Sequence, residues 1–514
     1  MLNYDFYLRE HAEFSFKQWG FEADTNSVIS PSGSQRIIIE NINWNAFRGK
    51  SHSELLWLYS LGAILKKYII VNSKEDLEII QKKVVEFLEF QTSKNNIYIY
   101  NSKYSYSYDH CAALRIKYLC MLSAKGYPDV DLIKKIINND LDWFLSLEKI
   151  PLNNHGMMLC ESIFHATVFL DKNKNRDELI NKASFFLENV LNYIFSDNYY
   201  ANENTIGYHD FYFKTLNNII NFLQDYSYSN PILERVKKII IGVEDALYRV
   251  VWPNGGIPPI GQCGEYNTKY NSIQGSHLFK PQGFFVKKDS ENYFSYICGL
   301  ETTIHKQVDD TSITLKLEGQ DIFLDCGLGS YDSKDSRQVV INGQRGHSGA
   351  FFRFFDSFTM WEFFNSKKIN DLSYSLEVND SLLKSLKSFR YKKHYYNINR
   401  NVNFVSFKEI ELKDSFETSD IYAQPVTRFI IPFETEITQI ENIIYLTIGF
   451  FEVKIICQDS FYFNILSSNM NCFSTSVAFQ SKSYGKYNII KVIEFTPLGK
   501  EMNFIINIKK IINK

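Results

Sequence analysis

The sequence predicts an α+β protein, with a helical N-terminal part and an antiparallel β-sandwich as its C-terminal part. From about Trp44 to Tyr248, apolar residues recur at the three- to four-residue spacing of helices. After about Trp252, short runs alternate apolar and polar residues and end at turn residues. Because the helices come first and the strands later, we expect separate domains rather than a mixed α/β sheet.

The helical part is predicted to contain about eight helices of roughly 10–20 residues. The first covers the apolar stretch Leu55–Val71, which holds Lys66 and Lys67. Since this stretch is shorter than the ~20 apolar residues of a membrane span, it is predicted to be one buried helix. The others are expected at about 77–88, 111–122, 130–147, 157–170, 177–195, 210–224 and 230–248.

A segment rich in Pro and Gly, residues 252–259, leads into the β-rich part. We place the domain limits so that residues 1–43 form an N-terminal arm, 44–270 the helical domain and 271–514 the β-sandwich domain. The runs expected to form strands lie at 284–288, 293–298, 312–319, 321–327, 353–364, 401–412, 428–440, 443–458, 462–466, 487–496 and 502–510.

Composition limits the classes of function. The 514 residues include 56 Lys and Arg against 58 Asp and Glu, a net charge of −2, so no overall basic field attracts nucleic acid or an anionic membrane. The 16% aromatic residues suit a β-rich core and surfaces that stack on sugar rings. The eight cysteines form no C-x-x-C pair, and buried thiols are expected. No signal peptide is seen, which predicts a cytoplasmic protein, or a periplasmic or secreted one whose leader was removed.

Two polar motifs lie at or before predicted helix N-termini. In the motif 153–156 (NNHG), one Asn is a good N-cap, but the second Asn and the His exceed what a cap needs. Backbone N–H groups at such a position favour an anion. In the motif 203–210, Tyr208 stands beside His209, and a phenol beside an imidazole suits proton transfer. A plain helix cap and ordinary tyrosine packing stay the alternatives.

A third motif lies in the β-rich part. Residues 305–312 read HKQVDDTS, and Asp325, Tyr331, Arg337 and His347 follow. His and Asp side chains on successive strands can converge on a metal or a substrate. A surface position of these residues is the alternative.

The order of the three motifs resembles the heparinase II/III-like polysaccharide lyases, which include alginate lyases of the same architecture. The resemblance covers about Trp44–Phe352 and includes the stretches 57–59 (WLY) and 108–115 (YDHCAALR). It implies an incomplete (α/α) toroid followed by an antiparallel β-sandwich, with an anionic polysaccharide or oligosaccharide bound in the cleft between them. It also implies cleavage of a uronic acid-containing glycan by β-elimination. The sequence predicts no oligomeric state.

The resemblance assigns roles to particular residues. Asn154, with His155 beside it, matches the residue that neutralises the uronate carboxylate while charge develops there. Tyr208 matches the tyrosine that protonates the leaving oxygen and in some members also removes the C5 proton. His305 matches the histidine proposed as the base or its partner. Whether Tyr208 or His305 is the base depends on the uronic acid and stays open. The residues expected to line the sugar site are Tyr108, Arg115, Glu203, His209, Tyr331 and Arg337.

No cofactor is expected for the chemistry itself. The resemblance implies a structural zinc held by a second histidine, an Asp and a later His, and here these positions are Gln307, Asp325 and His347. An amide oxygen is a poor zinc ligand. The site is therefore expected to be lost, weakened or filled by a harder cation.

Two other functions stay open. A non-catalytic glycan-binding or assembly protein, for example in capsule polysaccharide biosynthesis, would keep the cleft without turnover, and Gln307 and the missing signal peptide favour it. A toroid glycoside hydrolase is the other, because its paired carboxylates meet only in the fold. An unsaturated uronate product would distinguish a lyase from both.

Overall fold

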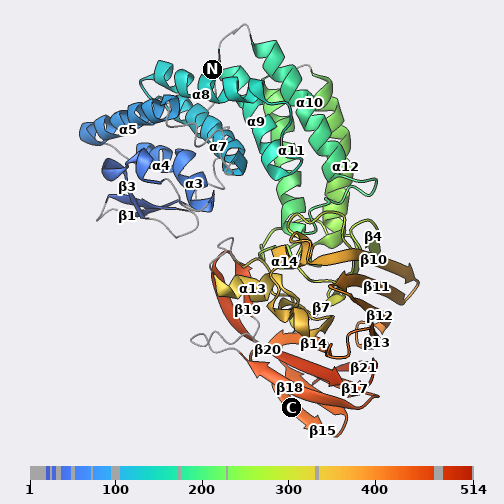
Figure 1. Ribbon diagram of the computed structural model, residues 1–514. Helices are drawn as coiled ribbons and strands as arrows, with labels where there is room; N and C mark the ends of the chain where they lie inside the picture. Colours follow the sequence, from blue (N-terminus) through green and yellow to red (C-terminus); the bar gives the residue numbers. More distant parts are fainter. Residues whose placement is uncertain are drawn as a thin grey trace. The chain divides into compact units, whose positions relative to one another are not determined.

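The computed structural model describes residues 19–22, 26–30, 36–47, 52–70, 73–93, 105–170, 175–226, 230–329, 335–467 and 479–511. The chain divides into two compact units (Figure 1). The helical unit contains residues 1–195 and 212–241, and the β unit contains residues 196–211 and 242–514. The sequence-based limits after residues 43 and 270 stay predictions.

Helices such as α5 bury one apolar stripe, whereas nearly every residue of α9 is buried. In α5, the Ser73 side chain accepts a hydrogen bond from the Asp76 N–H, and the buried Val84 and Phe87 face inward. The last part of α12 and the first residues of α11 belong to the β unit. The helices are α3 (His52–Tyr59), α4 (Gly62–Ile70), α5 (Lys74–Thr92), α7 (Ser105–Ala124), α8 (Val130–Ser146), α9 (Asn154–Phe169), α10 (Arg176–Ile194), α11 (Ile206–Asp225) and α12 (Pro231–Val250).

The prediction of one helix over 55–71 was wrong, because α3 and α4 are separate helices. Leu61 lies between them with φ +62°, in the left-handed region that interrupts a right-handed helix. Gly62 then opens α4, and a Cβ there would come within 2.7 Å of the Trp19 indole nitrogen. The break therefore lets the chain pass close to a buried tryptophan.

A small antiparallel sheet lies in the region that the sequence predicted only as an arm. Its strands are β1 (Gly20–Glu22), β2 (Ser27–Ile29) and β3 (Arg36–Ile38), paired in that order. Val28 and Ile37 are buried. Each strand is only three residues long, too short for a clear alternating pattern in the sequence.

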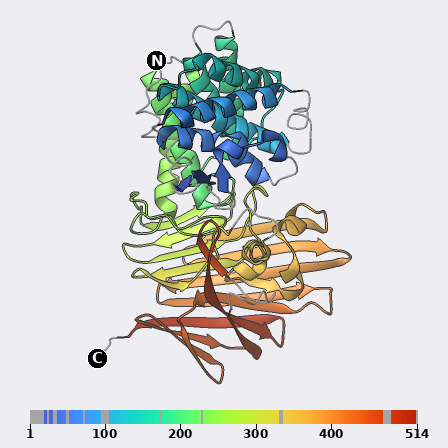
Figure 2. The same ribbon diagram turned by 90° about the vertical axis from the view of Figure 1, so that its left-hand side faces the viewer.

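The β unit is built from antiparallel sheets (Figures 1 and 2). An eight-stranded sheet has the order β10-β11-β12-β13-β21-β17-β16-β15; a five-stranded sheet follows the order β4 to β8, and another has the order β18-β20-β14-β9 with β19 beside β20. The strands are β4 (Gly275–Phe279), β5 (Phe284–Lys288), β6 (Tyr293–Ile297), β7 (Ser312–Leu317), β8 (Gln320–Phe323), β9 (Ala350–Phe352), β10 (Ile369–Asn379), β11 (Leu382–Tyr391), β12 (His394–Ser406), β13 (Glu409–Thr418), β14 (Pro425–Pro432), β15 (Glu436–Ile440), β16 (Ile443–Ile448), β17 (Phe451–Cys457), β18 (Phe461–Ser467), β19 (Phe479–Ser483), β20 (Lys486–Pro497) and β21 (Glu501–Lys510).

Aromatic pairs join the sheets across this core. Phe294 of β6 contacts Phe404 of β12 with ring centroids 5.0 Å apart, and Phe429 of β14 contacts Phe504 of β21 at 5.8 Å. All four rings belong to one buried cluster. The inner faces of the three sheets therefore bury one another, as in a sandwich.

The predicted strand at 353–364 was wrong, because this run forms the short helix η6 (Arg353–Ser357) and the helix α14 (Met360–Phe364). Thr359 and Glu362 form a capping box, in which each side chain binds the other's backbone N–H. This local pairing starts a helix inside a run of aromatic residues. Within the described residues, no helix combines the length and apolar character needed to cross a membrane.

Candidate active site

Two loops of the β unit are tied together by backbone and side-chain hydrogen bonds. The Asn204 side-chain amide donates to the carbonyl oxygens of Thr302 and Ile304, at 2.8 and 3.0 Å. The Thr302 hydroxyl donates to the carbonyl oxygen of Asn202 at 2.9 Å. The residues around position 204 are thereby fixed against the residues around position 305, about 100 positions later in the chain.

His305 is held by a buried carboxylate. Its Nδ1 lies 3.0 Å from Glu203 Oε2, and Glu203 is 2% exposed. A neutral imidazole that donates its Nδ1–H to Glu203 keeps a lone pair on Nε2, the form a general base requires. The φ of His305 is +53°, a strained value for this residue type and one that is concentrated at functional sites.

The ring of Tyr208 lies flat against the ring of His305. The two centroids are 3.6 Å apart and the planes differ by 14°. Tyr208 is half-buried in the first turn of α11, inside the helix rather than before it as the sequence suggested. The preceding Gly207 is needed because a Cβ there would lie 2.8 Å from Cys263 Sγ. The β unit thus brings together three predicted site residues: Glu203, Tyr208 and His305.

His209 faces away from this group. Its Nδ1 accepts a hydrogen bond from the Ala201 N–H at 3.2 Å, and its Nε2 lies 2.9 Å from the carbonyl oxygen of Val243. The ring is completely buried, and this burial lowers the pKa of His209 to about 4. The geometry gives His209 a structural role in place of the substrate contact that the sequence suggested.

We expect His209 to make the protein less stable in mild acid. The unfolded side chain takes up a proton below pH ~6.5 while the folded one stays neutral down to about pH 4, so stability falls as the pH drops through this window. The loss from His209 should reach about 2 kcal/mol at pH 5. Urea unfolding at pH 7.5 and pH 5 should show a smaller pH effect in His209→Gln than in the native chain. An equal pH effect in both would contradict this assignment.

The residue after His305 is a buried cation. Lys306 Nζ forms ion pairs with Asp309 and, at 3.0 Å, with Asp310, and all three side chains are essentially inaccessible. Burial opposes the charge, but the two carboxylates outweigh it and raise the pKa of Lys306. Lys387 lies 3.3 Å from Asp310, which compensates the second carboxylate. These ion pairs link the turn 305–310 to Lys387 of β11.

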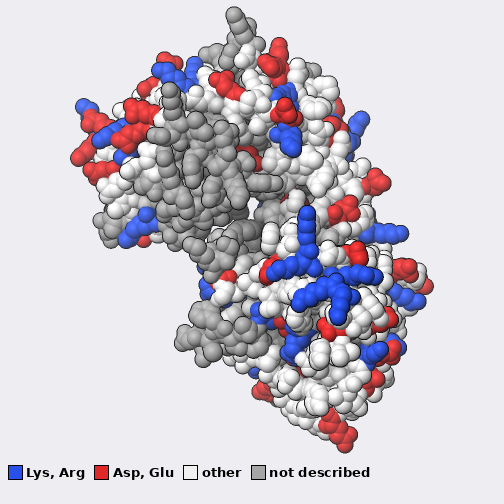
Figure 3. All heavy atoms as spheres, in the orientation of Figure 1, with Lys and Arg blue, Asp and Glu red and all other residues white. Residues whose placement is uncertain are grey.

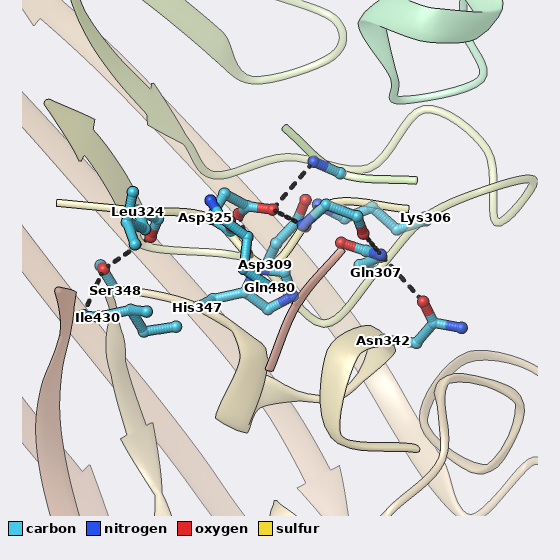
Figure 4. Close-up of polar contacts among 12 residues, drawn as sticks. Lys306, Gln307, Asp309, Leu324, Asp325, Asn342, His347, Ser348, Ile430 and Gln480 are labelled. Carbon is cyan, nitrogen blue, oxygen red and sulfur yellow. Dashed lines mark hydrogen bonds and ion pairs between the residues drawn. The ribbon is translucent and has the colours of Figure 1, made fainter. Parts of the chain in front are cut away.

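The three predicted metal ligands lie in one buried region (Figure 4). His347 Nδ1 lies 2.8 Å from Asp325 Oδ2, while Asp325 Oδ1 accepts from the N–H groups of Gly261 and Gly327 at 3.2 and 3.0 Å. The Gln307 amide nitrogen donates to the carbonyl oxygen of Gly327 at 3.0 Å and to Asn342 Oδ1 at 2.9 Å. Most of the atoms that could bind a metal here are therefore already hydrogen-bonded to other protein groups.

This arrangement does not fit the zinc site that the sequence resemblance implies. Both Asp325 oxygens are hydrogen-bonded, and Gln307 offers only a neutral amide oxygen. Gln307 Oε1 and His347 Nε2 are buried and have no hydrogen-bond partner among the described residues. That same part of the chain holds no group of three or more His, Cys, Asp or Glu placed for a metal.

In the helical unit, the motif 153–156 separates into structural and unassigned residues. Asn153 is the N-cap of α9, and its side chain accepts from the His155 N–H at 3.0 Å. Gly156 is required because a Cβ would come within 1.9 Å of the Pro151 carbonyl oxygen. The cap involves Asn153 and the close approach involves Gly156. Neither feature explains why the side chains at positions 154 and 155 are Asn and His.

Two residues that the sequence reasoning did not single out surround His155. Its Nδ1 lies 3.4 Å from Asp109 Oδ1, and its ring centroid lies 4.4 Å from that of His110. Burial, followed by the nearby His155 and Lys117, lowers the pKa of His110 well below its ordinary value. Both Asp109 and His110 lie in the stretch 108–115 that carries part of the resemblance. The spacing of 46 residues between Asp109 and His155 gave no sign of their contact.

Tyr108 and Arg115 lie in a buried network rather than on an open surface. The Arg115 guanidinium binds both oxygens of Asp140 and donates to the Tyr59 carbonyl oxygen at 2.6 Å. The Tyr108 hydroxyl donates to Asp140 Oδ1 at 2.7 Å. Arg115 is 1% exposed and Tyr108 4%. Their contacts indicate a structural role in the helical unit.

The last two predicted sugar-site residues follow β8 in the chain. Arg337 on α13 (Ser336–Asn342) binds both oxygens of Asp335 at 2.9 and 3.0 Å and lies over the Tyr487 ring at 3.9 Å. Its guanidinium is therefore already paired with a carboxylate. Tyr331 lies outside the described residues.

Comparison with solved structures gave matches over nearly the whole chain. A crystal structure of heparinase III has a TM-score of 0.70 and 12% sequence identity, covering 100% of this chain and 85% of that one. A heparinase III gene product has a TM-score of 0.64 at 11% identity, covering 91% and 81%. A mutant of the heparan sulfate lyase HepC from Pedobacter heparinus has a TM-score of 0.61 at 12% identity, covering 94% and 81%. No protein-family model and no curated protein sequence matches the chain.

The chain shares the fold of heparinase III. The likeness confirms the predicted fold class, with helices first and antiparallel sheets second. The similarity lies in the backbone, at 11–12% sequence identity.

Proposed function

We propose that this protein is a polysaccharide lyase of the heparinase II/III type that cleaves a uronic acid-containing glycan by β-elimination. The observation that carries the proposal is the group Glu203–His305–Tyr208. The phenol ring of Tyr208 stacks on the imidazole of His305, and the buried Glu203 carboxylate lies within hydrogen-bond distance of His305 Nδ1. The heparinase III fold and the order of the sequence motifs support the same class of enzyme.

In the proposed reaction, His305 Nε2 takes the proton from C5 of the uronate. The electron pair of that C–H bond forms the C4=C5 double bond, and the bond between C4 and the glycosidic oxygen breaks. The Tyr208 hydroxyl gives its proton to the leaving oxygen. Glu203 keeps His305 in the tautomer with the lone pair on Nε2 and stabilises the imidazolium that forms.

The substrate is proposed to be an anionic polymer. Elimination requires a carboxylate next to C5, because removal of the C5 proton places charge on that group. The neighbours in fold carry the names heparinase III and heparan sulfate lyase, so heparan sulfate is the first polymer to test. Alginate, hyaluronan and bacterial capsule polymers follow, since each can supply a 4-linked uronate.

The test is an absorbance assay in the near ultraviolet on these polymers. A 4,5-unsaturated uronate absorbs there, whereas a hydrolysis product does not. We expect a steady rise on at least one polymer. Reducing ends released without that absorbance would indicate the hydrolase, and tight binding without any product would indicate the non-catalytic glycan-binding protein.

Replacing Glu203 with Gln should lower kcat by about 10- to 100-fold with little change in KM. The amide oxygen can still accept the Nδ1–H of His305, but the negative charge that stabilises the imidazolium is gone. Steady-state kinetics measures kcat and KM, and Glu265→Gln, a change in a half-buried carboxylate elsewhere in the β unit, is the control. A kcat equal to that of Glu265→Gln would contradict the role of Glu203.

Asn154 and Asn153 form a matched pair for testing the predicted carboxylate contact. Asn154→Ala should lower kcat/KM by about 10²- to 10³-fold, because a donor to the developing charge is lost. Asn153→Ala removes the N-cap of α9 and should cost about 1 kcal/mol of stability while largely keeping activity. Kinetics and urea unfolding of both variants separate the two effects. Equal losses of activity would remove Asn154 from the proposed reaction.

A further inference from the structure

One surface of the β unit combines exposed aromatic rings with lysines. This basic–aromatic face consists of Phe354, Trp361, Lys367, Lys368, Lys392 and Lys393. Trp361 is 61% exposed and Phe354 49%, and all four lysines are exposed. Figure 3 shows Lys and Arg side chains gathered on the β unit in the region where Figure 1 labels α14 and β10.

Two of these lysines, Lys368 and Lys392, flank one aromatic cluster. Lys392 Nζ lies 5.4 Å from the ring centre of Tyr391, and Phe354 contacts the same ring at 5.4 Å. Lys368 Nζ lies 5.7 Å from the ring centre of Phe358, which contacts Tyr391 at 5.5 Å. Aromatic rings therefore lie between Lys368 and Lys392.

The positive charge of the face is only partly compensated. Lys368 binds Glu362 Oε1 at 2.7 Å. Lys392 interacts electrostatically with the Asp420 carboxylate. Within the part of the chain that the structure describes, no ion pair is found for Lys367 or Lys393, so the face keeps positive charge for an anionic ligand, even though the whole chain carries a net charge of −2.

Trp361 is held outward by a rigid element. The capping box of Thr359 and Glu362 fixes α14, and Phe363 on the same helix is 2% exposed. The helix is thus anchored by one aromatic ring and presents another to solvent. A large exposed indole on a fixed helix is typical of a binding surface, and a sugar ring stacks well on it.

This face adjoins the turn that carries His305. Asn365, one residue after α14, lies 3.4 Å from the Thr303 hydroxyl. Val308 of the turn packs in the same buried cluster as Phe358 and Phe363. An anionic chain bound along α14 would therefore run close to the proposed base.

We propose that the basic–aromatic face is a subsite for the anionic glycan, with a sugar ring on Trp361 and carboxylate or sulfate groups on Lys367, Lys368, Lys392 and Lys393. This inference rests on the proposed function. It adds a second contact surface, which binds sugar units of the polymer at a distance from the bond that is cleaved. Sugar stacking and charge pairing together fit a polyanionic carbohydrate better than either feature alone.

The experiment measures binding of the full chain, carrying Tyr208→Phe to prevent turnover, to immobilised heparan sulfate, alginate and hyaluronan. Trp361→Ala should raise the Kd for the bound polymer by about tenfold. Changing Lys367, Lys368, Lys392 and Lys393 together to Gln should weaken binding similarly and flatten its dependence on salt. Controls are Tyr462→Ala, 64% exposed on β18, and a fourfold Lys→Gln change at the exposed positions Lys384, Lys408, Lys486 and Lys500.

Three results would overturn the inference: no binding to any of these polymers at low salt, equal effects of the face variants and their controls, or equally tight binding to duplex DNA. The unsaturated-product assay on the native chain reports separately on the proposed function. Binding that depends on the face without any unsaturated product would keep the subsite and reject the lyase.

Discussion

Tyr208→Phe is expected to lower kcat by about 10³-fold or more while the fold stays intact. The substitution removes one hydroxyl from a half-buried ring and keeps the ring that stacks on His305 at 3.6 Å. The variant lacks the proton for the leaving oxygen but keeps the ring, so KM should change little. Initial rates of near-ultraviolet absorbance on the best polymer measure this effect.

The control for Tyr208 is another phenol of the β unit. The Tyr270 hydroxyl donates to Asp210 Oδ1 at 2.6 Å, and Tyr270→Phe removes that hydroxyl without touching His305. Tyr270→Phe should keep most of the activity. If Tyr208→Phe retained as much activity as Tyr270→Phe, the assignment of the acid would be wrong.

Lys306→Met is expected to lower the free energy of unfolding by about 3–5 kcal/mol. Methionine fills similar space but leaves Asp309 and Asp310 buried with Lys387 as the remaining nearby cation. The loss should be largest near neutral pH and shrink in acid, where the freed carboxylates can take up protons. Urea unfolding at several pH values measures it.

Two further variants separate this effect from a general loss of lysine charge. Lys306→Met combined with Asp310→Asn should recover part of the lost stability, because one uncompensated charge is removed. Lys509→Met breaks an exposed pair with Glu452 and should cost less than about 1 kcal/mol. A similarly small cost for Lys306→Met would contradict the role of the buried cluster.

Local sequence patterns predicted the order of the elements well. The helix expected at 130–147 is α8, Val130–Ser146, because its apolar residues keep a helical spacing without interruption. The patterns failed where tertiary packing or a single helix cap determines the local secondary structure. Leu61 and Gly62 break a continuous apolar run near Trp19, and the capping box of Thr359 starts a helix in a run that looked like a strand.

The candidate site was predictable only in its residue types. The motifs named Tyr208 and His305, but the contact between Glu203 and His305 joins positions 102 residues apart and appears only in the fold. The same limit applies to Arg115, which was expected to bind the sugar. Its guanidinium instead binds Asp140, a buried carboxylate 25 residues later in the chain. A sequence shows which groups are available, and the fold decides which of them are already paired.

The most direct test of the central claim is the fate of solvent oxygen in the cleavage products. The reaction is run on the polymer that gives the largest absorbance change, in water labelled with heavy oxygen, and the products are weighed by mass spectrometry. Elimination adds no water, so the account predicts unsaturated fragments without the label, absent in Tyr208→Phe. Fragments that carry one labelled oxygen and no double bond would show hydrolysis and contradict the account.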